Sequence, residues 1–292
     1  MRTNGLWLLL ALIFFSSYAS AALPLTVEDL VTDKGKIKLD ISLSYANSDN
    51  QGISTGEPVL IQTGLTSFIS LPTLIEENRG NTDSMVATAG LRYGLSDRAE
   101  IYVRTSYLSE ASRTTTPSST NSNSEHHFVD AWTGINYQFK SDDHTPALLG
   151  FSEIALRERH TSSSSSFRSM LFGVTTYRAI DPMVFSLTAA YRLNREREDG
   201  RQNFKPGNLL LINPSAAFAA NDRVTLTTGM QWTSRAADVR DRSRQGVRRT
   251  SSDLILGVGY GVSKETILNL TFKSNVSGSN GADLRLNCLH TF

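Results

Sequence analysis

The chain has 292 residues, a formal net charge of +1 at pH 7 and a single cysteine. The nearly neutral charge removes the electrostatic basis for a nucleic-acid partner, and one cysteine excludes an internal disulfide. A hydrophobic content of 39% resembles that of a soluble protein but also fits a membrane barrel, in which apolar and polar residues alternate along each strand.

The first 22 residues predict a cleaved export signal, because Arg2 precedes an apolar run over 6–15 and a small-residue stretch over 16–22. The run is too short for a membrane-spanning helix, which needs about 20 apolar residues, so an N-terminal anchor is the less favoured alternative. Residues 23–35 then form a periplasmic segment. Its stretch Thr26–Val31 is expected to be a short helix capped by Thr26, and we hypothesise that it plugs or gates a lumen.

From residue 36 onward, apolar and polar residues alternate in segments of about 10 to 13 residues, close to the length of a tilted membrane strand. In the first segment, 36–47, isoleucine, leucine and tyrosine alternate with lysine, aspartate and serine. The same period of two recurs over 84–95, 100–107, 129–140, 183–194, 224–232, 254–260, 268–272 and 283–292. The pattern predicts an all-β protein, a transmembrane antiparallel up-and-down β-barrel over 36–292.

The connections alternate in length, as expected for tight periplasmic turns and longer outer loops. Short turns are expected at 96–98, 141–146, 180–182, 220–222 and 263–265. Long polar loops are expected at 109–127, 159–167, 194–207, 234–252 and 274–282.

Twelve strands result when the segments are counted back from Phe292 to the 36–47 strand. The stretch 58–71 also has an extended pattern, but a thirteenth strand would break the even count of bacterial single-chain barrels. We therefore place it in a long first outer connection, as a hairpin arm or lid. Segments 147–158, 168–179 and 208–219 are apolar on both faces for part of their length, which leaves their facing open.

Aromatic residues mark both expected membrane interfaces, where amphipathic rings settle. Tyr93, Tyr137, Tyr177, Phe218 and Tyr260 precede short turns, and Tyr45, Tyr107, Tyr191, Trp232 and Phe272 lie close to long loops. The position of Tyr177 is unresolved, because it has the opposite parity from the apolar residues before it in its segment.

Residues 92–101, Arg-Tyr-Gly-Leu-Ser-Asp-Arg-Ala-Glu-Ile, follow the alternating first strand. They resemble outer-membrane proteins grouped with the phenol meta-cleavage pathway, a family similar to the barrel portion of functional-amyloid secretion channels. The resemblance covers most of the mature chain as a rhythm of hairpins, and its specific residues are confined to that hairpin. It implies a twelve-stranded transport barrel for hydrophobic aromatic substrates or for secreted polypeptide. Secretion channels of this type carry a long N-terminal coiled coil, whereas this chain has only 23–35 there.

The terminal Phe292 ends an alternating strand, which resembles the recognition signal of the barrel assembly machinery. We therefore expect that machinery to be a partner.

No catalytic, cofactor or metal site is predicted. None of the five histidines combines with serine and aspartate in a nucleophile pattern, and Gly150-Phe151-Ser152-Glu153-Ile154 lacks the second glycine of a nucleophile elbow. The adjacent His126 and His127 would point apart on an extended chain, which disfavours a shared metal.

Parity predicts a set of charged residues that face the lumen. They are Arg92, Glu100, Arg104, Asp130, Lys140, Glu153, Arg157, Arg192, Asp253, Lys273, Asp283 and Arg285, with Lys36, Lys38 and Asp40 of the same parity on the first strand. Both signs occur in comparable number, so no strong ion selectivity is expected. In the loop 235–249, an excess of arginine predicts contact with the phosphates of lipopolysaccharide, with a merely solvated loop as the alternative.

The sequence thus predicts an outer-membrane channel that passes small, possibly aromatic, molecules or a secreted polypeptide. The alternative is a non-conducting surface barrel that acts through its loops, as an adhesin or structural protein. Cargo identity and a homo-oligomeric state stay open.

Overall fold

The computed structural model describes residues 31–48, 52–55, 58–62, 68–72, 75–78, 81–116, 119–159, 164–199, 202–277 and 281–292. All regular elements within these ranges are β-strands. Among the residues described, no helix is long and apolar enough to cross a membrane. The expected export signal and all of the expected plug helix except Val31 lie outside the described residues.

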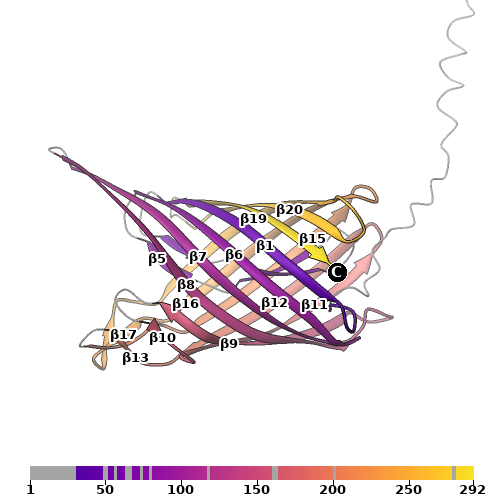
Figure 1. Cartoon of the computed structure of the whole chain (residues 1–292), viewed down its shortest axis with the longest axis horizontal. Helices are drawn as coiled ribbons and strands as arrows, with labels where there is room; N and C mark the ends of the chain where they lie inside the picture. The colour runs from indigo at the N-terminus through magenta and orange to yellow at the C-terminus, as the bar shows by residue number, and fades with distance from the viewer. Residues whose placement is uncertain are drawn as a thin grey trace, which may run out of the picture.

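Twelve strands form one closed antiparallel barrel (Figure 1). Each pairs with its neighbour in the chain; β21 pairs with β1, and β8 pairs with β9, so the ring has no open edge. The strands are β1 (Ile37–Ser48), β6 (Asn81–Ser96), β7 (Ala99–Thr116), β8 (Ser119–Lys140), β9 (Ala147–Arg159), β11 (Ser169–Ile180), β12 (Met183–Asn194), β15 (Leu209–Ala219), β16 (Val224–Arg235), β19 (Arg249–Gly261), β20 (Thr266–Asn275) and β21 (Gly281–Thr291).

The alternation of the sequence corresponds to the two faces of the barrel wall. On β1, for example, Ile41 is 51% exposed and points outward, whereas Ser42 is 6% exposed and points inward. Large apolar side chains are exposed in the same way on β6, β7, β12, β16, β19, β20 and β21. An apolar belt of this extent is stable only against lipid.

The three segments with apolar residues on both faces have a defined facing. On β9, Leu149, Phe151 and Glu153 are buried inside the ring; on β11 the odd-numbered residues face inward, and on β15 Leu209 and Leu211 do so. Tyr177, only 2% exposed, therefore lies inside the barrel, and its expected place in the periplasmic aromatic belt is wrong.

The long connections are more ordered than the sequence indicates. The prediction of a loop over 109–127 is wrong: the β7–β8 hydrogen-bonded ladder continues outward until Thr116 pairs with Ser119. Serine, threonine and asparagine can occupy a fully paired hairpin, so a polar composition does not require a loop. The β12–β15 and β16–β19 connections together form a sheet of β13 (Arg197–Asp199), β14 (Gln202–Lys205), β17 (Asp238–Arg240) and β18 (Ser243–Gln245). The two-residue β10 (Ser164–Ser165) pairs with the outer end of β9.

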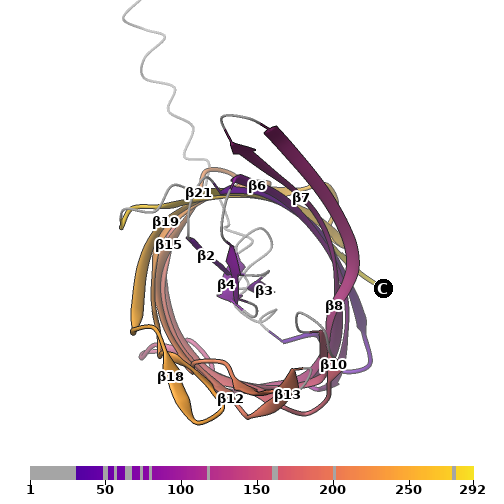
Figure 2. The same cartoon turned by 90° about the vertical axis from the view of Figure 1, so that its left-hand side faces the viewer.

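The first outer connection contains two small antiparallel pairs, which include the stretch 58–71. These are β2 (Gly52–Thr55) with β5 (Ile75–Asn78), and β3 (Pro58–Gln62) with β4 (Phe68–Pro72). β4 lies close to β12 and β15. Seen from the end that carries the long connections, β2, β3 and β4 lie inside the ring (Figure 2). The described strands β2, β3 and β4 are therefore folded inward and do not stand above the barrel as an arm.

The outward facing of the apolar residues predicts a depth-dependent effect of charge on stability. Replacement of Leu256, in the middle of the outer face of β19, by arginine should lower the free energy of unfolding by about 2–4 kcal/mol, because the charge would enter hydrocarbon. Thr250→Arg, on the same face and strand but near the outer end, should cost about 0–1 kcal/mol. Urea unfolding in lipid vesicles, followed by tryptophan fluorescence, measures both, and equal costs would contradict the facing.

Candidate functional site

The barrel interior gathers most of the charged residues that parity selected. Arg92, Glu100, Arg104, Asp130, Glu153, Arg192, Asp253 and Arg285 are buried, and Lys273 and Asp283 are partly buried. They come from eight strands and form three groups, at the periplasmic end, in the middle and at the outer end.

The periplasmic group is centred on Arg92 of β6. Its guanidinium lies 3.0 Å from a carboxylate oxygen of Asp40 and 3.7 Å from one of Glu100. Asn136 donates to Glu100 at 2.6 Å, and Asn287 donates to Asp40. Register explains the cluster, because Lys38 of β1 pairs with Arg92, Arg92 pairs with Tyr102, and Glu100 pairs with Asn136.

The middle group surrounds Glu153, which is 1% exposed. Its two oxygens accept hydrogen bonds from the Tyr102 hydroxyl at 2.7 Å and from Arg104 at 2.8 Å. Trp132 lies between two guanidinium groups, with Arg104 at 5.2 Å and Arg192 at 5.0 Å from the ring centroid, and its Nε1 donates to Asp130 at 2.9 Å. These cation–π contacts and ion pairs fix the rings against the wall.

The outer group joins wall and loops. Glu158 of β9 pairs with Arg192 and lies 3.5 Å from Arg197 of β13. On the opposite side of the ring, Asp283 lies 3.8 Å from Lys273 and 3.6 Å from Arg285. The inner wall therefore carries cations and anions in paired arrangement, as a low-dielectric surrounding requires.

Three of the predicted lumen residues lie elsewhere. Lys36 is exposed just before β1, and its Nζ donates to Asp33 at 2.5 Å. Arg157 is exposed because β9 has a β-bulge at Leu156: Ala131 pairs with Arg157, whereas the next residue, Trp132, pairs with Ala155. The extra residue reverses the facing of the outer end of β9, so Glu158 faces inward in place of Arg157. Lys140 lies at the periplasmic turn, where it donates to Asp143; this bond and the backbone N–H of Thr145 hold the pKa of the Asp143 carboxyl well below its ordinary value.

Several interior residues were not predicted as site residues. Tyr102, Trp132, Asn136, Glu158 and Arg197 all take part in the charged network. Parity placed Tyr102, Trp132 and Asn136 inside, but a neutral side chain gives no signal of charge pairing. Parity did not select Glu158, which follows the bulge, or Arg197, which lies in the expected loop 194–207.

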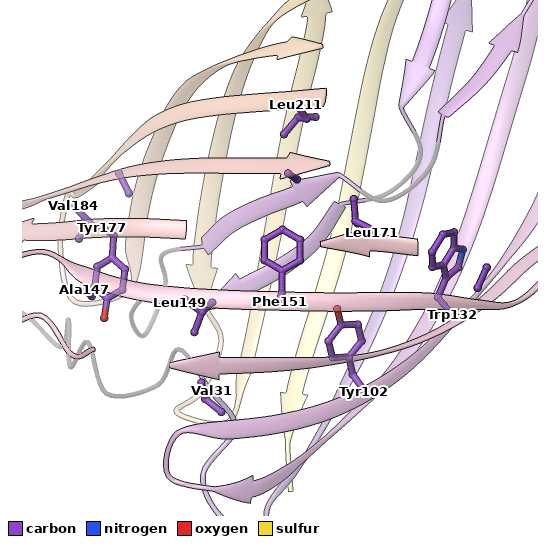
Figure 3. Close-up of a cluster of buried hydrophobic side chains, with 13 residues drawn as sticks. Val31, Tyr102, Trp132, Ala147, Leu149, Phe151, Leu171, Tyr177, Val184 and Leu211 are labelled. Carbon is purple, nitrogen blue, oxygen red and sulfur yellow. The ribbon is translucent and has the colours of Figure 1, made fainter. Parts of the chain in front are cut away.

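An apolar inner wall lies beside this network, on β9, β11, β12 and β15. Figure 3 shows its members, among them Leu149, Phe151, Leu171, Tyr177, Val184 and Leu211, which form one buried cluster with Tyr102 and Trp132. The sequence signal for it was the apolar character of both faces in 147–158, 168–179 and 208–219. Apolar side chains on the inner surface of β9, β11, β12 and β15 thus lie next to the charged pairs, and Tyr102 and Trp132 contact both.

The segment before β1 enters the periplasmic end of the lumen. Val31 and Thr32 are buried, and Glu100 accepts hydrogen bonds from the Thr32 backbone N–H at 2.7 Å and from its hydroxyl at 2.6 Å. Gly35, with a φ of +80°, turns the chain into β1. Gly94 permits the close approach, since a Cβ there would lie 2.0 Å from the Asp33 carbonyl oxygen.

His126, His127 and Phe292 complete the residues singled out from sequence. The two histidines are successive residues of β8, so their side chains point to opposite faces. Among the described residues, no group of three or more His, Cys, Asp or Glu is arranged to hold a metal ion. Phe292 is exposed at the periplasmic end, and its backbone N–H donates to Ile37 at 2.8 Å.

Comparison with solved structures shows that the fold is similar to those of outer-membrane proteins. It is similar to an outer membrane channel from Pseudomonas putida F1, with a TM-score of 0.66 and 10% identity over 90% of this chain and 98% of that one. It is similar to the translocator domain of autotransporter NalP from Neisseria meningitidis (TM-score 0.52, 10% identity, 91% and 92% covered) and to the NanC porin (0.51, 10%, 86% and 98%). No protein-family model and no curated protein matches the chain.

The closed ring, its apolar belt and these likenesses define the class: the chain is a twelve-stranded outer-membrane β-barrel.

The ion pair at Glu153 predicts a stability effect from inside the barrel. Glu153→Gln should lower the free energy of unfolding by about 3–5 kcal/mol, because Arg104 would keep its charge in a buried place without the carboxylate to which it donates. Glu196→Gln, at an exposed position with no ion pair among the described residues, should leave it unchanged. Guanidinium unfolding in detergent micelles compares the two, and similar losses would show that Arg104 does not depend on Glu153.

The position of residues 31–34 in the periplasmic end of the lumen predicts that displacing them changes the conductance of the barrel. Gly94→Ala should expel residues 32–34 from the periplasmic mouth and raise single-channel conductance in planar bilayers, because its Cβ would collide with backbone oxygens. Gly90→Ala, also on the inner face of β6, meets its nearest atoms at 3.6 Å and should behave as the unaltered protein. An unchanged trace for Gly94→Ala would remove the idea that this segment obstructs the lumen.

Proposed function

We propose that the protein is a channel for small molecules of mixed apolar and polar character, such as aromatic acids. The observation that supports the proposal is the mixed interior, in which paired charges and an apolar cluster lie side by side on the inner surface.

The occupied lumen favours small cargo over a secreted polypeptide. Residues 31 and 32 are buried at the periplasmic mouth, and β3 and β4 lie inside the ring in Figure 2. An extended polypeptide with side chains is about 10 Å wide, so both segments would have to leave before it could pass. A small solute needs only the space between them and the wall.

The pairing of charges supports weak ion selectivity. Arg92, Arg104 and Arg192 each lie against a carboxylate, so the wall presents little net field to a passing ion. The apolar cluster that contains Phe151, Leu171 and Leu211 suits an aromatic ring, and the neighbouring arginines suit a carboxylate or hydroxyl; because these apolar side chains are buried, the solute would have to displace what covers them. We expect no catalytic activity from this arrangement.

The second candidate is a non-conducting surface barrel. It is favoured by the complete burial of Trp132, Asp130 and Asn136, which indicates that the interior is filled at their level. The outer hairpin of β7 and β8 would then be the functional surface. The homo-oligomeric state and recognition of Phe292 by the barrel assembly machinery remain predictions for either function.

Solute flux separates the two candidates. Liposomes that contain the protein should swell in iso-osmotic benzoate faster than protein-free liposomes do, because the lumen admits small amphiphilic solutes. The same protein-containing liposomes should swell more slowly in raffinose than in benzoate. Liposomes that contain Gly90→Ala serve as a matched control with an intact interior. Equal swelling with and without protein, in both solutes, would support the sealed barrel and refute the channel.

A further inference from the structure

Two arginines of β9 lie on the lipid-facing side of the wall, near its outer end. The β-bulge in β9 turns Arg157 outward, and Arg159, two residues further along the strand, has the same facing. The guanidinium of Arg157 lies 5.9 Å from the ring centroid of Phe128, which pairs with Tyr107 of the outer aromatic belt. Because aromatic belts lie at headgroup depth, both arginines reach the headgroup layer.

Arg168 and Arg195 form a like-charge pair at the outer end of the next two strands. The Arg195 backbone N–H donates to the Arg168 carbonyl at 2.7 Å, so the two residues face each other in continuation of the β11–β12 ladder. Each is the chain neighbour of a residue in the buried, inward-facing pair Ser169 and Asn194, so both arginines take the outward face. Like charges directly opposite each other destabilise a sheet, so this pair indicates an anionic partner.

The four arginines are not neutralised within the part of the chain that the structure describes. Arg159, Arg168 and Arg195 are exposed, and none of them has an ion pair or a side-chain hydrogen bond there. Arg157 donates only to the Ser164 hydroxyl, at 3.5 Å. Their charges are therefore left for an external partner.

The acidic residues next to these positions do not balance them. Glu125 of β8 and Glu158 of β9 have the inward facing of their strands. Glu196 and Glu198 follow Arg195 along the chain, but neither forms an ion pair with any of the four arginines. Four cations thus share this part of the outer face with two carboxylates that are not paired with them.

An apolar groove of about 490 Å³ lies on the lipid-facing side of the same strands. Its lining includes one row of successive cross-strand partners, which are Ile135, Ser152, Phe172, Tyr191 and Leu210. Because barrel strands are tilted, a row perpendicular to them crosses the membrane obliquely. The row starts near the outer ends of β12 and β15, where Tyr191 lies four residues before Arg195 in the chain. The groove therefore begins just below the arginines.

The arginines and the groove together fit a single amphiphile with an anionic head and a hydrocarbon chain. Figure 1 shows β10, which pairs with the outer end of β9, at the end of the barrel that carries the long connections. This end faces the outside of the cell in outer-membrane barrels, so the lipid at hand is that of the outer leaflet. Lipopolysaccharide has both parts, because its lipid A anchor carries phosphate groups and acyl chains.

We propose that Arg157, Arg159, Arg168 and Arg195, called here the arginine cluster, bind the phosphate groups of one lipopolysaccharide molecule, with an acyl chain in the groove. Guanidinium groups pair with phosphate oxygens through two parallel hydrogen bonds, and a phosphate between Arg168 and Arg195 removes their repulsion. The site lies on the outside of the barrel and does not depend on whether the lumen conducts. The loop 235–249 lies outside this cluster, and its contact with lipopolysaccharide stays a prediction.

The test measures how tightly the full protein binds lipid A. Native mass spectrometry of the protein in detergent micelles counts the bound molecules and gives the dissociation constant. Arg159→Gln/Arg168→Gln/Arg195→Gln removes three cations of the cluster and keeps Arg157, which packs on Phe128. This variant should bind about tenfold more weakly, which corresponds to about 1.4 kcal/mol shared by three exposed contacts.

Two further variants separate the site from general effects of charge and fold. Arg98→Gln/Arg223→Gln/Lys264→Gln has the same charge change at exposed positions of the periplasmic turns and should bind as the unaltered protein does. The charge-retaining variant Arg159→Lys/Arg168→Lys/Arg195→Lys should keep the affinity within about threefold. The proposal is overturned if the glutamine variant of the cluster binds lipid A as tightly as the unaltered protein, or if the periplasmic variant loses affinity equally.

Two altered probes separate the head from the chain. Dephosphorylated lipid A should bind the unaltered protein and the cluster variant equally weakly, because it lacks the groups that the arginines recognise. The deacylated, phosphorylated disaccharide should bind more weakly than lipid A, because it leaves the groove empty. The proposal is also overturned if removal of the phosphates has no effect, or if the deacylated probe binds as tightly as lipid A.

Discussion

Closure of the hydrogen-bonded ring is the constraint on which the rest of the structure depends. Backbone N–H and C=O groups in hydrocarbon have no water to pair with, so each strand needs a neighbour on both sides. The β1–β21 and β8–β9 pairings supply the last of these. Once the ring is closed, every residue faces lipid or lumen, and the period of two in the sequence follows directly. A helix-forming or irregular stretch of equal length would leave polar groups unpaired at membrane depth.

Closure also determines how charge is accommodated. An inward-pointing side chain such as Glu153 is surrounded by side chains from other strands of the barrel, so its charge needs a counter-ion or hydrogen-bond donor within the interior. The cross-strand neighbours provide the partners, since inward residues of adjacent strands lie within reach of each other. The apolar cluster on β9, β11, β12 and β15 is the complementary solution, in which leucine, valine and aromatic side chains fill the space beside the charged pairs of the same strands. The interior is accordingly a paired, neutral surface and differs from a water-filled lining of unpaired charges.

Much of this could be predicted from the sequence, because the period-two pattern is a direct record of facing. The strand number, the short turns and the inward position of Arg92, Glu100 and Arg104 depend on nothing else. Arg157 could not be placed, since the bulge at Leu156 reverses parity without a mark such as glycine or proline. Tyr177 could not be placed either, because both faces of β11 are apolar and an aromatic side chain suits lipid or core. The inward fold of the first connection depends on tertiary packing near β12 and β15, to which a sequence pattern is blind.

The same parity rule connects the lumen to the cell surface. Arg197 on β13 is held by Glu158, which also holds Arg192, and Arg192 lies against Trp132 in the middle of the barrel. The sheet of β13, β14, β17 and β18 is therefore an extension of the interior network, attached by the row of Arg197, Phe204 and Arg240. Its register leaves Lys205 and Arg244 only one direction, away from the axis. The outward position of these cations is thus a consequence of the ion pairs formed on the opposite face. The same face also carries Glu198, which pairs with Asn203 two residues before Lys205, so cations and carboxylates lie side by side there as they do in the interior.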